Sequence, residues 1–146
     1  ITAPGQLVYK LLGEIADHQE APLICSGIIG YRSLKLCGLR FGQKLGIYGF
    51  GASAHITLQV VIHLNCEVYV FTRSEEHRIH AEELGAVWSG GSNDDPGVEL
   101  DSVLIFAPSG VLMVDSLKNL RKGGTVVSAG IHMSGIPKFP YRLLYG

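Results

Sequence analysis

A glycine-rich stretch with the sequence IYGFGASA, at residues 47–54, has the spacing of a turn that binds phosphate. Gly49 permits a sharp turn at a strand end, and Gly51 lets the backbone approach a pyrophosphate with no Cβ in the way. Ala54 takes the third position, where a small residue lets the following helix lie close to the strand. Backbone amides at the helix N-terminus then face the anion. The stretch therefore predicts cofactor-binding residues at Gly49, Phe50, Gly51, Ala52 and Ser53.

A second stretch, FTRSEE at residues 71–76, follows at the end of the next expected strand. Cofactors whose ribose keeps a free 2′-hydroxyl usually meet an Asp or Glu there, whereas this chain has Thr72, Arg73 and Ser74. A guanidinium fork and two hydroxyl donors suit a 2′-phosphate, so this stretch favours NADP, with NAD as the alternative. In a simpler interpretation, Thr72 and Ser74 only cap the following helix and Arg73 is solvated.

Short apolar strands alternate with helices along the chain, and both stretches fall at strand ends. We expect strands at residues 45–48, 67–71, 86–88, 101–107 and 124–130, and helices at residues 52–65, 75–84 and 111–120. This alternation predicts an α/β fold, a Rossmann-type doubly wound parallel sheet in three layers. The glycine turn follows a strand and opens a helix, which is the context that the motif requires. The alternatives are a tight turn that binds nothing and a methyltransferase-like nucleotide site.

Composition narrows the class of protein. The 146 residues suit one domain, and 47% hydrophobic with 17% charged residues predicts a packed core. A net charge of −1 argues against nucleic acid and anionic membranes as partners, and no apolar run is long enough to span a bilayer. Three widely spaced cysteines without a CxxC pair argue against a disulfide framework, so we expect a reducing, cytoplasmic location.

The residues before Gly38 are expected to be mostly helical. Pro22 suits an early helical position, and apolar contacts are expected from Leu23, Ile24, Ile28 and Leu34. The chain has no initiating Met, so we expect it to begin partway into a longer protein.

Several segments together resemble the zinc-type alcohol dehydrogenases of the medium-chain dehydrogenase/reductase family. They are APLICSGIIGYRSLKLCGLRFGQKLGIYGFG, TRSEEHRIHAEELGA, LRKGGTVVSAGIHMSGIP and YRLLYG. The resemblance implies hydride transfer between an alcohol or aldehyde and NAD(P), with zinc as a Lewis acid on the substrate oxygen. In that family the last of the three zinc ligands is a cysteine in a helix before the cofactor domain, and Cys25 matches it.

The resemblance also implies how the chain is divided. Residues 1–40 would be a helical lead-in from the catalytic domain, and residues 41–146 the NAD(P)-binding domain, cut at its last strand. The other zinc ligands, the structural-zinc lobe and the proton relay are absent from this sequence, and Ile29 stands where many members have Thr. We therefore expect the chain alone to be inactive, and a homo-oligomer through the cofactor domain is possible. Further cofactor contacts are expected at His77, Ala107, Pro108, Gly130 and Ile131.

Other functions stay open at this point. A zinc-independent quinone or enone reductase of the same family would need no metal ligand, and Cys25 would then be a packing residue. A nucleotide-binding module without redox chemistry is a third reading. His77 and His80 lie three residues apart, so they could bind a metal ion from one face of a helix. A solvated charged face is the favoured interpretation.

Overall fold

The computed structural model describes residues 2, 4, 5, 8 and 15–145 and contains one five-stranded parallel sheet in the order β3-β2-β1-β4-β5. The strands are β1 (Lys44–Tyr48), β2 (Glu67–Phe71), β3 (Trp88–Gly90), β4 (Leu100–Ile105) and β5 (Leu120–Ser128). All four strand pairings are parallel. The predicted α/β fold is therefore confirmed.

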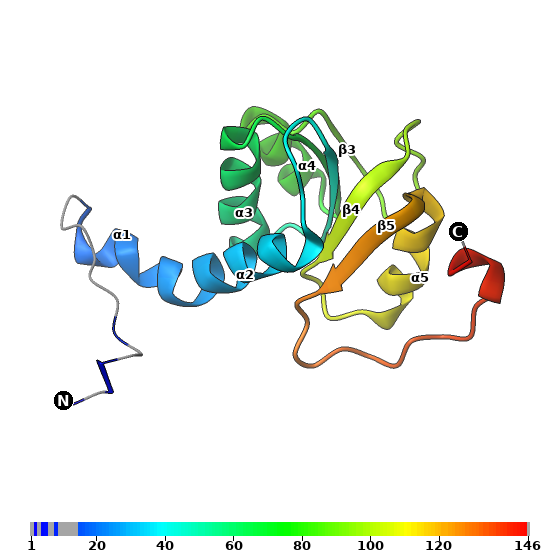
Figure 1. The fold of residues 1–146 in the computed structure, drawn as a ribbon. Coiled ribbons are helices and arrows are strands. Elements are labelled where there is room, and N and C mark those ends of the chain that lie inside the picture. The colour runs from blue at the N-terminus through cyan, green and yellow to red at the C-terminus, as the bar shows by residue number, and fades with distance from the viewer. Residues whose placement is uncertain (1, 3, 6–7, 9–14, 146) are drawn as a thin grey trace.

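Helices cover both faces of this sheet, as three layers require (Figure 1). The helices of the described residues are α1 (Asp17–Pro22), the π-helix η2 (Leu23–Gly27), α2 (Ile28–Cys37), α3 (Ala52–His63), α4 (Glu75–Glu83), α5 (Gly110–Asn119) and the 3₁₀ turn η3 (Tyr141–Leu143). Helix α1 extends away from the sheet. Helices α2, α3 and α4 lie on one side, and α5 lies on the other. Helix α2 approaches α3 closely at Gly30, where a Cβ would overlap the Thr57 hydroxyl.

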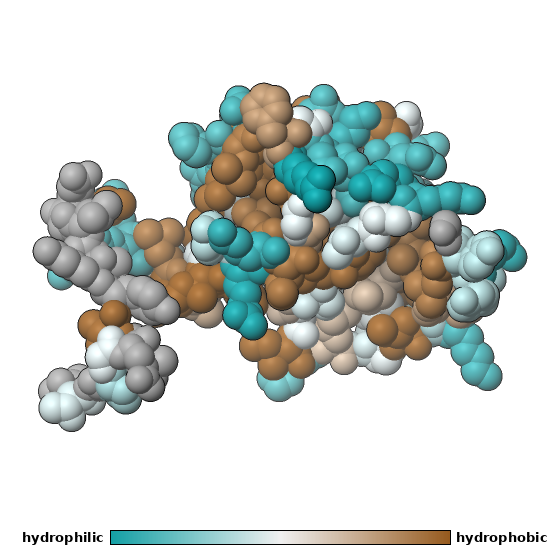
Figure 2. Space-filling model, in the orientation of Figure 1, coloured by the Kyte–Doolittle hydropathy of each residue, from teal (hydrophilic) through white to brown (hydrophobic). Residues whose placement is uncertain are grey.

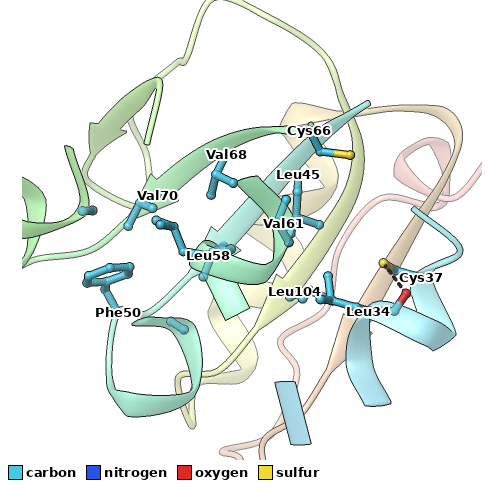
Figure 3. Packing of buried hydrophobic residues seen from close by; sticks show 13 residues of the cluster. Leu34, Cys37, Leu45, Phe50, Leu58, Val61, Cys66, Val68, Val70 and Leu104 are labelled. Atoms are coloured by element: carbon cyan, nitrogen blue, oxygen red, sulfur yellow. Dashed lines mark hydrogen bonds between the residues drawn. The ribbon is translucent and has the colours of Figure 1, made fainter. Parts of the chain in front are cut away.

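Strand side chains alternate between two buried clusters, because successive residues of a strand point to opposite faces. On the side of α2, α3 and α4, Leu45 and Ile47 of β1 pack with Val68 and Val70 of β2 and with Leu58 of α3 (Figure 3). This cluster also contains Leu34 and Cys37 of α2 and Cys66. Cys37 and Cys66 are thus packing residues of this cluster.

The cluster on the α5 side is built around aromatic rings. Tyr48 and Phe71 stack with centroids 4.1 Å apart and planes 6° from parallel, and Trp88 lies 4.9 Å from Phe71. The Tyr48 hydroxyl accepts a hydrogen bond of 3.0 Å from Asn119 Nδ2 on α5. Burial raises the pKa of Tyr48 above its ordinary value, so the phenol stays neutral.

Some local expectations were wrong. Pro22 is the last residue of α1, not an early helical one, and the π-helix η2 begins directly after it. Proline lacks the amide that closes an ordinary helical turn, so the hydrogen-bond pattern changes at this point. Of the four predicted apolar contacts only Leu34 is buried, while Leu23, Ile24 and Ile28 are exposed. Figure 2 shows hydrophobic surface along these lead-in helices.

The boundaries of several elements also differ from the expected ones. Strand β3 is two residues later than expected, at Trp88–Gly90, and β5 begins at Leu120, four residues early, with an irregular register against β4. Helix α3 ends at His63, shortly before Asn65, whose φ of 56° is left-handed.

Candidate cofactor site

A cavity of about 560 Å³ lies at the carboxyl ends of β1, β2 and β4. The strand order reverses between β1 and β4, and ligands of open α/β sheets bind in the crevice at such a reversal. The cavity is lined by Gly49, Phe71, Thr72, Arg73, Ser74, His77, Ser92, Asn93, Ala107, Pro108, Ser109, Val111, Leu112 and Asp115. Seven of the residues predicted from the sequence are thus brought together, namely Gly49, Thr72, Arg73, Ser74, His77, Ala107 and Pro108.

The glycine turn closes β1 at this cavity. Gly49 has a φ of 89°, and its N–H donates to the Phe71 carbonyl at 2.8 Å. A Cβ on Gly49 would lie 2.9 Å from the Ala107 nitrogen, so both the backbone conformation and the space require glycine. Gly51 differs: a Cβ there would meet none of the described residues within 4 Å, so its backbone faces open space.

Helix α3 starts directly after Gly51, which is its N-cap residue. No side chain in the described part of the chain caps this end. The first amides of α3 are therefore free to bind an anion. Gly51, Ala52 and Ser53 lie at this helix start and do not line the cavity itself.

Phe50 contributes only its backbone to this turn. Its side chain is 5% exposed and belongs to the hydrophobic core. The ring lies among three histidines, with centroids 6.5 Å from His55 and 6.3 Å from both His77 and His80. His80 Nδ1 lies 3.4 Å from Glu83 Oε2 on the exposed face of α4. His77 and His80 are both exposed on α4, and the choice of a solvated charged face over a metal site stays a prediction.

The end of β2 is held by hydrogen bonds to the backbone of Thr72, and Arg73 beside it is exposed. The Thr72 N–H donates to the Gly90 carbonyl at 2.8 Å, and Arg78 Nε donates to the Thr72 carbonyl at 2.9 Å. Ser74 Oγ accepts the His77 N–H at 3.3 Å, as an N-cap of α4. The exposed guanidinium of Arg73 takes part in none of the ion pairs found among residues 15–145. Both predicted roles of Ser74, cap and cavity wall, are geometrically compatible.

The ends of β4 and β5 form the other side. Ala107 and Pro108 line the cavity, and the position of a Cβ on Gly130 is 3.8 Å from the Ala107 carbonyl oxygen. Gly130 and Ile131 lie outside the lining, and Ile131 is 88% exposed. Their assignment as cofactor contacts stays a prediction.

Sequence reasoning missed four polar residues of the lining, namely Ser92, Asn93, Ser109 and Asp115. Ser92 and Asn93 lie in the loop after β3, where the Gly91 N–H donates to Asp94 Oδ2 at 2.6 Å. Their signal was the position after a parallel strand, since the carboxyl ends of such strands meet at one edge. Asp115 had no such signal, because only the packing of α5 against the sheet brings it to the cavity.

Cys25, the predicted zinc ligand, is exposed in η2. Among the residues that the structure describes, no group of three or more His, Cys, Asp or Glu side chains could hold a metal ion. One thiolate cannot form a zinc site alone, so the described residues do not by themselves fit zinc. No helix in the same residues is long and apolar enough to cross a membrane.

Comparison with known proteins gives a consistent class. None of the protein-family models matches the chain. "Probable alcohol dehydrogenase AdhA" of Mycobacterium tuberculosis is 43% identical over 141 residues, which are 97% of this chain and 41% of that protein. "Probable formaldehyde dehydrogenase AdhA" of Bacillus subtilis is 34% identical over 135 residues, covering 89% of this chain and 39% of that protein. The chain thus spans about two fifths of the length of these relatives.

Solved structures agree with these relatives. The quinone oxidoreductase of Thermus thermophilus, also solved in its complex with NADPH, has a TM-score of 0.80 at 26% identity, over 97% of this chain and 48% of that one. CAD of Helicobacter pylori, complexed with NADP(H), has a TM-score of 0.75 at 27% identity, over 83% of this chain and 35% of that one. The fold is that of a Rossmann-type dinucleotide-binding domain. The chain belongs to the medium-chain dehydrogenase/reductase family, among relatives named alcohol dehydrogenase.

Proposed function

We propose that this chain is the NADP(H)-binding part of a zinc-dependent alcohol dehydrogenase. One observation carries the proposal: the cavity at the sheet reversal joins the glycine turn at Gly49 to Thr72, Arg73, Ser74 and His77, with no carboxylate at the end of β2. The relatives named alcohol dehydrogenase and the NADP(H) complexes of neighbouring structures support it.

The residues of the chain would hold the cofactor in three places. The free amides at the start of α3 would bind the pyrophosphate, which approaches over Gly51. The guanidinium of Arg73, with the hydroxyls of Thr72 and Ser74 and the ring of His77, would bind the 2′-phosphate. Gly130 and Ile131, beyond β5, would face the nicotinamide. When bound, the cofactor would accept or donate the hydride that an alcohol or aldehyde exchanges.

The cofactor preference is tested by titrating the protein with NADPH and NADH and following cofactor fluorescence. We expect tighter binding of NADPH, and a loss of about tenfold or more in NADPH affinity for Arg73→Ala, because a charge-assisted contact to the phosphate disappears. NADH affinity should change little. Arg32→Ala is the matched control, since it removes an exposed guanidinium from α2, outside the cavity. Preference for NADH would contradict the NADP assignment, and binding of neither would contradict the cofactor site.

Among the described residues, Cys25 is the one that the proposal assigns to zinc. We propose that Cys25 supplies one ligand and that the remaining ligands come from parts of the protein outside this chain. Metal analysis of the intact protein tests this: Cys25→Ser should lose zinc, whereas Cys37→Ser, which alters a buried packing cysteine, should keep it. Zinc retained by Cys25→Ser would contradict the ligand assignment.

A second candidate is a zinc-independent quinone or enone reductase. The similarity to the quinone oxidoreductase of Thermus thermophilus favours it. Full activity of a metal-free protein on a quinone or enone would support this candidate and remove the first. Tight NADPH binding without turnover of alcohols, quinones or enones would instead indicate a nucleotide-binding module.

Further parts of the proposal concern the chain as a whole. We propose that residues 41–146 form the cofactor domain and residues 1–40 a lead-in, and that the isolated chain is inactive, because it lacks the other zinc ligands. Zinc-dependent alcohol oxidation by the isolated chain would contradict this. A cytoplasmic location and pairing through the cofactor domain stay predictions.

A further inference from the structure

Asp115 is a carboxylate that the proposed function leaves unused. It lies in the middle of α5, is 7% exposed as a residue, and lines the cavity with Val111 and Leu112 of the same helix. Val111 and Asp115 are four residues apart, so the two side chains follow one another on one helix face. One turn further along α5, Asn119 donates to the Tyr48 hydroxyl.

One oxygen of this carboxylate is already engaged. Lys118 Nζ donates to Asp115 Oδ1 at 2.8 Å. The Lys118 side chain is 55% exposed and the Asp115 side chain 9% exposed, so the ammonium is on the solvent side of the pair. The lysine compensates the charge of the carboxylate and leaves its second oxygen for a donor in the cavity. An ionised carboxylate only accepts hydrogen bonds, so the group that it selects must be a donor.

The walls around Asp115 describe the shape of that group. Val111 and Leu112 are aliphatic and Phe71 is aromatic, while Ser92 and Asn93, from the loop after β3, are polar. Apolar walls with a few polar groups suit a flat heterocycle with one polar edge. Thr72, Arg73 and Ser74 are in the same cavity, and under the proposed function they hold the ribose phosphate that carries the adenine.

Resting on the proposed function, we infer that Asp115 recognises the adenine of the cofactor by accepting a hydrogen bond from its exocyclic 6-amine. Adenine carries this amine as a donor, and the Asp115 oxygen that Lys118 does not bind can accept it. Asp115 is then a residue that determines base specificity, at a distance from the residues that read the 2′-phosphate. Lys118 holds the carboxylate in place and does not itself touch the base.

The test compares two cofactors that differ at one position. NADPH and its analogue with unsubstituted purine, in which hydrogen replaces the 6-amine, are titrated against the intact protein by fluorescence. We expect wild type to bind NADPH about tenfold to a hundredfold more tightly than the analogue, which corresponds to one hydrogen bond to a charged group. Asp115→Ala should bind both cofactors equally, by losing affinity only for NADPH.

Two further variants separate recognition from folding. Lys118→Met removes the ion pair but keeps the carboxylate, and it should keep the preference for NADPH. Asp115→Asn keeps the volume and a neutral acceptor, so its preference should lie between those of wild type and Asp115→Ala. If Asp115→Ala does not fold, the cofactor preference of Asp115→Asn serves as the test in its place. Equal binding of the two cofactors by wild type, or an unchanged preference in Asp115→Asn and Asp115→Ala, would overturn the inference and leave the proposed function standing. Failure of wild type to bind either cofactor would overturn both.

Discussion

The two ends of the sheet contain polar residues that are used in opposite ways. At the amino end, Asp101 of β4 accepts hydrogen bonds from the Lys44 N–H at 2.9 Å, from Arg121 Nε at 2.7 Å and from Gln43 Nε2 at 3.3 Å. These contacts join the starts of β1, β4 and β5 to one another. At the carboxyl end, Arg73, His77 and Asp115 surround a cavity.

This difference separates stability from binding. Polar groups that satisfy one another within the fold contribute to the free energy of unfolding, but they have no capacity left for a ligand. Groups that face a cavity contribute less to folding and can be exchanged with smaller loss. We therefore expect substitutions at the amino end to alter stability without altering NADPH binding, and the reverse at the carboxyl end. Gly49 is the exception, because the fold itself depends on it.

The largest effect is expected from Gly49→Ala. Its φ of 89° strains any other residue, and the new Cβ would lie 2.9 Å from the Ala107 nitrogen. We expect a loss of about 2–4 kcal/mol in the free energy of unfolding, measured in urea, together with loss of NADPH binding. Wild-type stability of Gly49→Ala would contradict the role of this position in the turn.

Gly51→Ala is the matched variant two residues later. Because a Cβ fits there, we expect the free energy of unfolding to change by less than about 1 kcal/mol. The same methyl group would occupy the space where the pyrophosphate approaches, so NADPH affinity should fall about tenfold or more. Wild-type NADPH affinity in Gly51→Ala would place the phosphate elsewhere.

At the amino end, Asp101→Asn should cost about 1–3 kcal/mol, because the Arg121 guanidinium and the Lys44 N–H lose a charged acceptor. NADPH affinity should stay unchanged, which separates the two ends of the sheet. Glu99→Gln, an exposed carboxylate two residues away, is the control and should change neither quantity. Weaker NADPH binding by Asp101→Asn would show that the two ends are coupled.

Lowering the pH should remove the contribution of Asp101 to the free energy of unfolding. Burial by itself would raise the pKa of this carboxyl, but hydrogen bonds from the Lys44 N–H and Arg121, with their charges, hold it below its ordinary value. A carboxyl whose pKa is lowered in the folded protein stabilises the fold above the unfolded pKa, and this stability is lost as pH falls through the folded pKa. The difference between wild type and Asp101→Asn should therefore be constant near neutrality and shrink below about pH 4. A constant difference down to pH 2 would contradict the ionised pair as its source.

A smaller effect is expected in the aromatic cluster on the α5 side of the sheet. Tyr48→Phe keeps the ring stacked on Phe71 but removes the acceptor of the Asn119 amide. The half-buried Asn119 amide loses its partner, which should lower the free energy of unfolding by about 1–2 kcal/mol. Tyr69→Phe is a useful comparison, because the hydroxyl of Tyr69 bonds to Glu67, which lies at the exposed start of β2. Equal losses in the two variants would show that burial of the hydroxyl is not what matters.

The sequence was sufficient to predict the structure at positions where one residue type satisfies a local requirement. The spacing of Gly49 and Gly51 and the N-cap at Ser74 each depend on neighbours in the chain, and the structure has them as predicted. Strands β1 and β2 lie within a residue of the expected ranges, with all their residues after the first buried. Thr72 and Arg73 also lie together at the cavity, because a strand end brings consecutive residues to one place. Their role in binding the cofactor stays a prediction.

Long-range packing explains most of what was missed. Whether Ile24 and Ile28 are buried depends on what covers the lead-in helices, and periodicity shows only that they are apolar. Asp115 resembles any solvated helix acid until α5 is placed against β1 and β4, which brings it to the cavity. Asn93 reaches the same cavity only because β3 pairs with β2.

The smallest change in stability is expected from Ser74→Asp, which tests whether Ser74 only caps α4. Asp caps helices as well as Ser, so the hydrogen bond from the His77 N–H can persist and the free energy of unfolding should change by less than about 0.5 kcal/mol. A carboxylate beside the proposed 2′-phosphate would repel it and would instead suit a free 2′-hydroxyl, so NADPH affinity should fall while NADH affinity holds or rises. Ser74→Ala is the converse variant, with a lost cap, a modest decrease in stability and no new repulsion. If Ser74→Asp keeps the wild-type preference for NADPH, Ser74 only caps α4, and the 2′-phosphate is bound by Arg73 and Thr72.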